Sequence, residues 1–200
     1  MKKQFISSNN LLLDSFRLGK KIEASGFKPD FLVGLWRGGT GVGIAVQECL
    51  DFLGIQTDHI SVRTSYAGLT NYRKMIKNPH SIRVHGLKYL YERAKKQHSI
   101  LLVDDVFSSG TSVNAVIEKL KDRTSKQFPC DIRIATVFYR PNQEKKSKPD
   151  FFIHQTKDWL VLPYELCGIS IKQLRNHKKE ILPVINQIEE RLKKSEAIKN

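Results

Sequence analysis

The chain has 200 residues, about one domain's length, and its 40% hydrophobic and 27% charged residues exclude a disordered or collagen-like protein. No apolar run approaches the roughly 20 residues that cross a bilayer, and the residues after Met1 lack the apolar segment expected of a secretory signal. The three cysteines include no C-x-x-C pair, which favours the reducing cytoplasm. A net charge of +14 predicts polyanionic partners, either nucleic acid or small phosphorylated substrates.

The first third of the sequence predicts a helix followed by a β-α-β unit. Asn9 and Asn10 can cap the helix, and Gly26 with Pro29 ends it. Its apolar positions are Leu12, Leu13, Phe16 and Ile22. The apolar run 31–35 indicates a strand buried on both faces, a helix starts near Gly41, and 59–63 forms the next strand.

The middle of the chain concentrates positive charge. Residues 65–85 show little periodicity and predict a long loop, which in a compact domain is usually functional, and a helix follows at 87–96. Nine basic residues face a single acid, Glu92, between positions 61 and 98: Arg63, Arg73, Lys74, Lys77, Arg83, Lys88, Arg93, Lys95 and Lys96. The basic side chains of this stretch could bind the phosphates of a substrate, or they could form only a solvated basic surface.

The second half repeats the alternation of strands and helices. The run 99–104 is a second strand buried on both faces, and a helix starts at Ser112 after the loop 105–111. Strands at 131–139 and within 151–166 follow, and a helical tail begins at Ile169, interrupted by Pro183. This order predicts an α/β fold with a central parallel sheet.

The sharpest chemical signal is the motif ILLVDDVFSSGTS at 100–112. A buried strand ends in Asp104 and Asp105, and a loop of small hydroxyl residues then leads into a helix N-terminus. The residues that can surround a phosphate there are Ser108, Ser109, Gly110, Thr111 and Ser112. The two carboxylates can hold vicinal hydroxyls or Mg²⁺ beside it, so the motif indicates a sugar phosphate.

This motif resembles the signature with which type I phosphoribosyltransferases bind phosphoribosyl pyrophosphate (PRPP). The resemblance covers about residues 30–167 and is closest to the hypoxanthine, guanine and xanthine enzymes. It implies the type I phosphoribosyltransferase fold, a central parallel β-sheet flanked by helices with a small hood. Asp104 and Asp105 would then hold the ribose hydroxyls and the metal, and residues 108–112 the 5-phosphate.

LVGLWRGG at 32–39 resembles the pyrophosphate loop of the same family. By this resemblance Arg37 and Gly38 bind the leaving pyrophosphate, and the Trp36–Arg37 peptide is cis. Ser65-Tyr66 resembles the pair on the mobile loop that closes over the site. It implies a PRPP-binding lid that excludes water.

Two later segments resemble the purine-binding hood of the family. Trp159 would stack on the base, the backbone of Leu160 would read its edge, and Arg140 would contact the 6-oxo group. The family usually has lysine at the position of Arg140. A planar guanidinium in place of a point charge can change how the base edge is recognised.

Ser108 departs from the pattern. Purine enzymes usually place here an aspartate that accepts the N7 proton of the base, and a serine hydroxyl cannot act as that base at neutral pH. Orotate enzymes and some PRPP-binding proteins also lack the acid. Among the six histidines there is no H-x-x-x-H or other metal spacing, and the sequence assigns them no role.

The sequence therefore predicts a single domain over 1–200, with a core at about 30–140, a hood of about 141–167 plus the N-terminal segment, and a tail at 169–200. The expected reaction transfers ribose 5-phosphate from Mg-PRPP to a 6-oxopurine, in purine salvage by a cytoplasmic homodimer or higher homo-oligomer. Two alternatives stay open. One is a PRPP-binding regulator that contacts nucleic acid, and the other is a transferase for another base such as orotate.

Overall fold

The computed structural model of the protein describes residues 3–66, 82–124, 131–141 and 147–184. The chain divides into two compact units. The sheet unit comprises Leu11–Lys157. The terminal unit combines Met1–Asn10 with Asp158–Asn200. None of the helices in the described ranges has the length and hydrophobicity to cross a membrane.

A six-stranded sheet forms the centre of the sheet unit, in the order β4-β3-β2-β5-β6-β7. Its strands are β2 (Phe31–Trp36), β3 (Asp58–Tyr66), β4 (Ile82–His85), β5 (Ser99–Phe107), β6 (Asp131–Tyr139) and β7 (Phe151–Gln155). Only β4 runs antiparallel to its neighbour. The predicted α/β fold with a parallel sheet is confirmed, and β6 has the predicted bounds.

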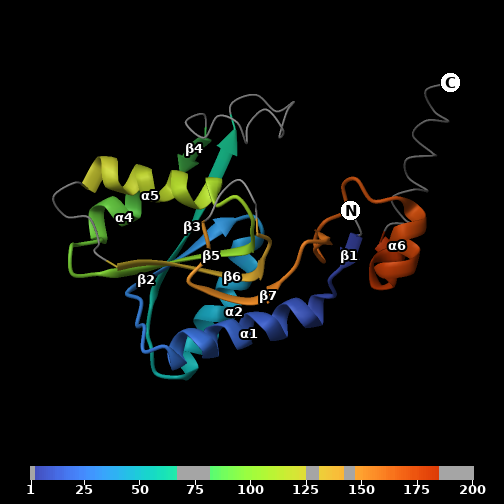
Figure 1. The fold of residues 1–200 in the computed structure, drawn as a ribbon, viewed down its shortest axis with the longest axis horizontal. Coiled ribbons are helices and arrows are strands. Elements are labelled where there is room, and N and C mark those ends of the chain that lie inside the picture. Colours follow the sequence, from blue (N-terminus) through green and yellow to red (C-terminus); the bar gives the residue numbers. More distant parts are fainter. Residues whose placement is uncertain (1–2, 67–81, 125–130, 142–146, 185–200) are drawn as a thin grey trace. The chain divides into compact units, whose positions relative to one another are not determined.

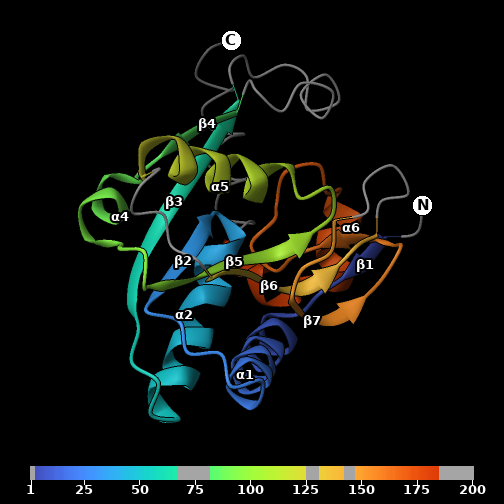
Figure 2. The ribbon, with the colours of Figure 1, turned by 60° about the vertical axis from the view of Figure 1, so that its left-hand side comes forward.

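Helices cover both faces of this sheet (Figures 1 and 2). The helices α1 (Ser8–Ala24) and α2 (Gly38–Phe52) lie on one face, and α4 (Lys88–Arg93) and α5 (Thr111–Thr124) lie on the other. The expected helix at 87–96 is shorter, because Ala94 is already extended. The edge strand β4 was not predicted, since four residues are too few to show a period.

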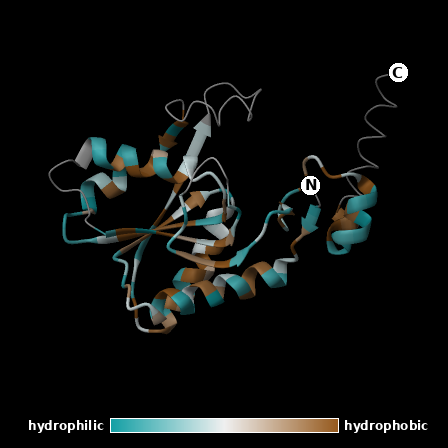
Figure 3. Cartoon of the chain, in the orientation of Figure 1, coloured by the Kyte–Doolittle hydropathy of each residue, from teal (hydrophilic) through white to brown (hydrophobic). Residues whose placement is uncertain are grey.

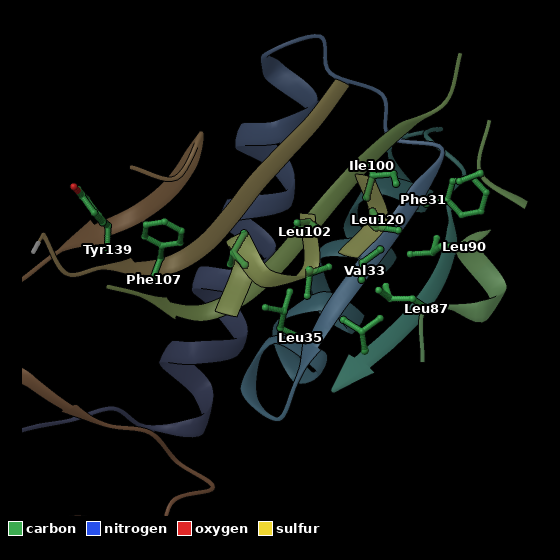
Figure 4. Packing of buried hydrophobic residues seen from close by; sticks show 14 residues of the cluster. Phe31, Val33, Leu35, Leu87, Leu90, Ile100, Leu102, Phe107, Leu120 and Tyr139 are labelled. Atoms are coloured by element: carbon green, nitrogen blue, oxygen red, sulfur yellow. The ribbon is translucent and has the colours of Figure 1, made fainter. Parts of the chain in front are cut away.

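The hydrophobic core beneath α4 and α5 is built from the two-sided apolar strands β2 and β5. Val33, Ile100 and Leu102 are fully buried there against Leu90 and Leu120 of the helices (Figure 4). Figure 3 shows the same pattern as hydrophobic colour along the central strands. The continuous apolar runs of the sequence therefore identified the buried strands correctly.

The buried face of α1 differs from the prediction. Leu12, Leu13 and Phe16 are exposed, and of the predicted positions only Ile22 is fully buried. The buried positions are Leu11, Asp14, Ser15, Leu18, Gly19 and Ile22. The cap also differs, because the backbone N–H of Asn10 donates to Ser7 Oγ (3.2 Å) and the helix begins at Ser8.

Polar contacts explain why α1 buries an acid. Asp14 accepts from Arg17 through Oδ1 and pairs with His154 Nε2 of β7 through Oδ2, both at 2.7 Å. Lys21 Nζ donates to the backbone oxygen of Phe152 in the same strand (2.8 Å). These contacts fix α1 on the edge strand of the sheet, which apolar periodicity alone could not indicate.

The terminal unit joins both ends of the described chain. Strand β1 (Lys3–Phe5) pairs in parallel with β8 (Trp159–Val161), and α6 (Ile171–His177) follows. After α6, Lys178 is buried, and its Nζ donates to the backbone oxygens of Leu162 (2.6 Å), Pro163 (3.0 Å) and Glu165 (2.5 Å). Burial lowers the pKa of Lys178 from its ordinary value.

Candidate active site

The candidate site lies where the order of the sheet changes direction. From β2 the chain passes through α2 to β3 on one side, whereas β5 lies on the other side of β2 and leads to β6. The last paired residues of β2 and β5 are Gly34 and Val103, so both strands continue past the end of their shared ladder. Ligands of parallel α/β sheets bind at such a switch point, beyond the carboxyl ends of the strands.

Two acids stand immediately past this ladder. The Asp104 carboxylate accepts the backbone N–H of Asp105 (2.9 Å), and the Asp105 carboxylate accepts that of Val106 (2.7 Å). Strand β5 does not end at the acids as predicted, because Val106 and Phe107 continue its pairing with β6. The acids therefore lie on a part of β5 that pairs with β6 but no longer with β2.

The position of Asp104 affects its ionisation. Burial and the adjacent Asp105 carboxylate raise the pKa of Asp104 well above its ordinary value. A cation or a hydrogen-bond donor at this position would relieve both effects. In the described ranges, no three acidic, histidine or cysteine side chains are grouped so that they could hold a metal ion together. A pair of carboxylates nevertheless suits Mg²⁺, which often takes one or two carboxylates together with substrate phosphates.

The loop after β2 reaches the same place through glycine. The Trp36–Arg37 peptide is cis, as the resemblance implied, and Arg37 is exposed. Helix α2 begins at Gly38 rather than near Gly41. A Cβ on Gly39 would collide with the Val103 carbonyl oxygen and lie 2.9 Å from the Asp104 Cα. Only a glycine lets this turn approach the acids so closely.

The hydroxyl loop forms the start of α5. Gly110 has φ +67°, and its carbonyl accepts the N–H of Asn114 (2.8 Å), so the helix begins at Thr111, one residue before the predicted start. Ser109 Oγ and Thr111 Oγ1 are hydrogen-bonded at 2.8 Å. Ser108 and Ser112 are half-buried on either side of them. A 14-residue helix directs its positive end and these hydroxyls at one point, which suits a phosphate.

A second segment supports this loop. Ser147 Oγ donates to the Ser109 carbonyl oxygen (3.4 Å) and would lie 3.0 Å from a Cβ on Gly110. No part in the site was expected for Ser147 from the sequence. Because 38 positions separate Ser147 from Ser109, no local pattern could have revealed the contact.

Ser65 and Tyr66 occupy the end of β3, which is longer than predicted. Ser65 Oγ is hydrogen-bonded to His85 Nε2 of β4 at 3.0 Å. No role was expected for His85 from the sequence, and in the structure it is the hydrogen-bond partner of Ser65, a residue expected to bind PRPP. Of the long loop expected at 65–85, both ends belong to strands β3 and β4, and the remainder, 67–81, lies outside the described residues.

The residues expected to bind the base fall in both units. Arg140 follows β6 in the sheet unit, and its N–H donates to the Phe107 carbonyl (2.8 Å), which links it to the strand of the acids. Trp159 and Leu160 belong to the terminal unit. Trp159 is 47% exposed, whereas Leu160 is buried and pairs with Gln4. The structure thus brings together the acids, the glycine loop, the hydroxyl loop and Arg140.

Comparisons with known proteins agree with this geometry. The profile of the family described as "Phosphoribosyl transferase domain" matches residues 6–166. The purine phosphoribosyltransferase of Pyrococcus horikoshii Ot3 is 20% identical with a TM-score of 0.61, over 85% of this chain and 98% of that one. The Helicobacter pylori xanthine-guanine-hypoxanthine phosphoribosyltransferase is 21% identical with a TM-score of 0.60, over 88% and 99%.

A third similar structure is a hypothetical protein from Neisseria gonorrhoeae with bound ppGpp. It is 15% identical with a TM-score of 0.63, over 90% of this chain and 97% of that chain. No curated protein matches the chain in sequence. At these identities the likenesses establish the shared fold, and the family profile carries the assignment of the family.

Proposed function

The chain belongs to the phosphoribosyltransferase family, and we propose that it transfers the ribose 5-phosphate group of Mg-PRPP to a 6-oxopurine base. The products are a nucleoside monophosphate and pyrophosphate. The observation that carries this proposal is the convergence at the β2–β5 switch point, where Gly39 packs against Asp104 and the hydroxyl loop follows on the same strand.

Each part of this site would meet a different part of PRPP. Asp104 and Asp105 would accept hydrogen bonds from the ribose hydroxyls and hold Mg²⁺. Ser108 to Ser112 would bind the 5-phosphate at the start of α5. Arg37 and the backbone of Gly38 would bind the pyrophosphate, with Ser65 and Tyr66 closing over it. When bound, Mg²⁺ would offset the negative charge that grows on the departing pyrophosphate.

A separate set of residues would bind the base. Trp159 would stack on the purine ring, the backbone of Leu160 would read its edge, and the Arg140 guanidinium would contact the 6-oxo group. The similar structures from Pyrococcus and Helicobacter, both named as purine phosphoribosyltransferases, support this choice. Hypoxanthine, guanine and xanthine all carry the 6-oxo group that Arg140 would recognise.

The chemistry asks the protein mainly for positioning and charge stabilisation. The bond from C1′ of the ribose to pyrophosphate breaks, the bond from C1′ to a ring nitrogen forms, and the base loses one proton. C1′ carries positive charge between the two events, so the nearby Asp104 and Asp105 carboxylates are favourably placed. Since Ser108 cannot take the base's proton, that proton would leave to water or pass through the serine hydroxyl.

We also propose that the whole chain acts as one phosphoribosyltransferase domain. The segment 141–167 and the N-terminal residues would supply the hood for the base, and a homodimer or higher homo-oligomer would be the working form. This division assigns Trp159 and Leu160 to the base and the sheet unit to PRPP.

A regulator that binds PRPP without transferring it is the second candidate. The Neisseria structure, which holds ppGpp, supports nucleotide binding by a protein of this fold. Ser108 in place of an acid favours either this regulator or a transferase for another base such as orotate.

The deciding experiment measures pyrophosphate release from PRPP and Mg²⁺ with hypoxanthine, guanine, xanthine or orotate. Release that depends on a 6-oxopurine would establish the proposed reaction. Release with orotate alone would reassign the base. No release with any base, together with calorimetric binding of PRPP, would identify the regulator.

A further inference from the structure

One face of the β3–β4 hairpin carries a set of side chains of which only Ser65 has a part in the proposed transferase reaction. The strand register places Trp36 of β2 beside Arg63 of β3, Arg63 opposite His85 of β4, and Ser65 opposite Arg83. Paired residues of neighbouring strands point to the same side of a sheet. We call this surface the hairpin face, consisting of Trp36, Arg63, Ser65, Arg83 and His85.

The opposite side of the hairpin is the one that faces the core. Val62 and Ile82 are buried, and Val84 packs against the core cluster. On the hairpin face, Arg63, Arg83 and His85 are exposed, and Trp36 is 55% exposed. The hydrogen bond between Ser65 and His85 links β3 and β4 on this side. The hairpin face is therefore a fixed surface open to solvent.

Among the described residues, no carboxylate neutralises the charge of this face. Its five positions include no acid, and no aspartate or glutamate of the described ranges forms an ion pair with Arg63 or Arg83. Other cations of the basic stretch are engaged elsewhere, because Lys88 pairs with Glu92 (3.8 Å) and Arg93 lies over the Tyr89 ring (5.9 Å). Two exposed guanidinium groups on one face of the hairpin complement an anionic partner.

We propose that the hairpin face binds single-stranded nucleic acid. Arg63 and Arg83 would contact successive phosphates, and the indole of Trp36 would stack on a base. Neighbouring strands lie about 4.8 Å apart, so Trp36 and Arg63 can reach one nucleotide together. A simple anion would gain little from an exposed indole, whereas every base offers a ring surface to it. The aromatic beside the guanidinium groups therefore selects a nucleic acid strand over inorganic phosphate.

The test uses the full chain and a short fluorescent oligouridylate, with anisotropy measured over a range of salt concentrations. Each phosphate neutralised on a single strand contributes about 0.7 to the slope of log affinity against log salt, so Arg63→Gln with Arg83→Gln should reduce the slope by about 1.4. The matched control is Arg175→Gln, an exposed arginine of α6, which should leave the slope unchanged. Trp36→Ala should weaken binding about 5- to 150-fold, the range for one stacked base.

A second readout concerns Trp36 alone. The chain has two tryptophans, so a Trp159→Phe background leaves Trp36 as the only one, and its fluorescence should be quenched when the strand binds. Equal slopes for the paired variant and the Arg175→Gln control would overturn the proposal. So would unchanged Trp36 fluorescence combined with equally tight binding of heparin, which would reveal only general attraction of polyanions. Pyrophosphate release by the same variants is scored separately, so neither result depends on the transferase assignment.

Discussion

The backbone of Gly39 lies directly against the backbone of Asp104, so close that a Cβ on the glycine would be 2.9 Å from the Asp104 Cα. This contact joins the first turn of α2 to the strand that carries both acids. It explains how a loop after β2 and a loop after β5 can serve one substrate. The glycine is thus a requirement of packing and not only of a turn.

Gly39→Ala is expected to disturb both stability and substrate binding. The new methyl group meets rigid backbone, so α2 must move away from β5, and overpacking of this kind costs about 1–3 kcal/mol. Gly41→Ala is the matched control, because no atom lies within 4 Å of a Cβ there and alanine favours the helix. Chemical denaturation should show a loss only for Gly39→Ala. Equal stability of both variants would contradict the contact.

Asp104→Asn should stabilise the protein without substrate while weakening its binding of Mg-PRPP. The variant keeps an oxygen that can accept the Asp105 N–H, and it removes a buried charge beside another carboxylate. Each kcal/mol gained would raise Tm by about 2–4 °C for a chain of this size. Thermal melts and calorimetric titrations measure the two effects. A lower Tm would show that the carboxylate is needed for the fold.

The raised pKa of Asp104 also sets a pH dependence. Between the ordinary aspartate pKa of about 3.9 and the raised value, the folded protein holds more protons than the unfolded chain, so its stability falls as pH rises. The stability difference between Asp104→Asn and the parent should therefore widen as pH rises above about 4. Melts over an acidic to neutral series test this. A difference independent of pH would refute the assigned cause.

Asp105→Asn should remove most activity and leave the fold intact. The amide oxygen can still accept a hydrogen bond from the Val106 N–H. The substitution therefore removes only the negative charge that would act on the ribose and the metal. We expect pyrophosphate release to fall about 100-fold or more, the order seen when one preorganised electrostatic group is lost. Asp122→Asn, an exposed acid of α5, is the control and should keep full activity. Normal turnover by a folded Asp105→Asn protein would disprove the PRPP assignment.

Trp159→Ala should raise the KM for the base about 5- to 150-fold, because one stacked base is worth about 1–3 kcal/mol. The KM for PRPP should change little. Trp159→Phe keeps an aromatic ring and should restore most of the affinity for the base. Steady-state kinetics with each substrate varied in turn measure the difference. Equal effects on both KM values would mean that Trp159 has only a structural role and does not stack on the base.

Ser108→Asp should raise kcat with hypoxanthine or guanine, because a positioned base contributes roughly 10²- to 10⁴-fold. Ser108→Asn has nearly the same shape without the basic group and should give no increase. The gain requires that the new carboxylate does not repel the 5-phosphate. If neither Ser108 variant exceeds the parent enzyme, N7 is not deprotonated at this position.

The sequence was most informative where local patterns and packing agree. The two-sided apolar runs predicted β2 and β5, and their order with the helices predicted a parallel sheet. The acids and the hydroxyl loop could be identified because all their residues lie within one short stretch, 100–112. The strand nevertheless continues to Phe107, because pairing with β6 outlasts the pairing with β2.

The missed features depend on contacts between distant residues. The support of Ser109 by Ser147 and the bond between Ser65 and His85 arise only after the chain has folded. The predicted buried face of α1 was wrong for the same reason. Asp14 is buried because His154 of β7 meets it, and the apolar Leu12 and Leu13 remain exposed. Hydrophobic periodicity cannot anticipate a buried carboxylate whose partner lies 140 positions away.

The parallel pairing of β1 with β8 has a consequence for synthesis on the ribosome. Lys3 contacts the carbonyl oxygen of Gly168, 165 positions further along the chain. Strand β1 therefore emerges early but can pair only when translation has passed β8. Until then its backbone lacks its strand partner, while the sheet unit between the two segments can already collapse. Folding during synthesis should thus be sequential, and a released fragment that ends at residue 157 should show protease protection of β2, β5 and β6 without protection of 3–5.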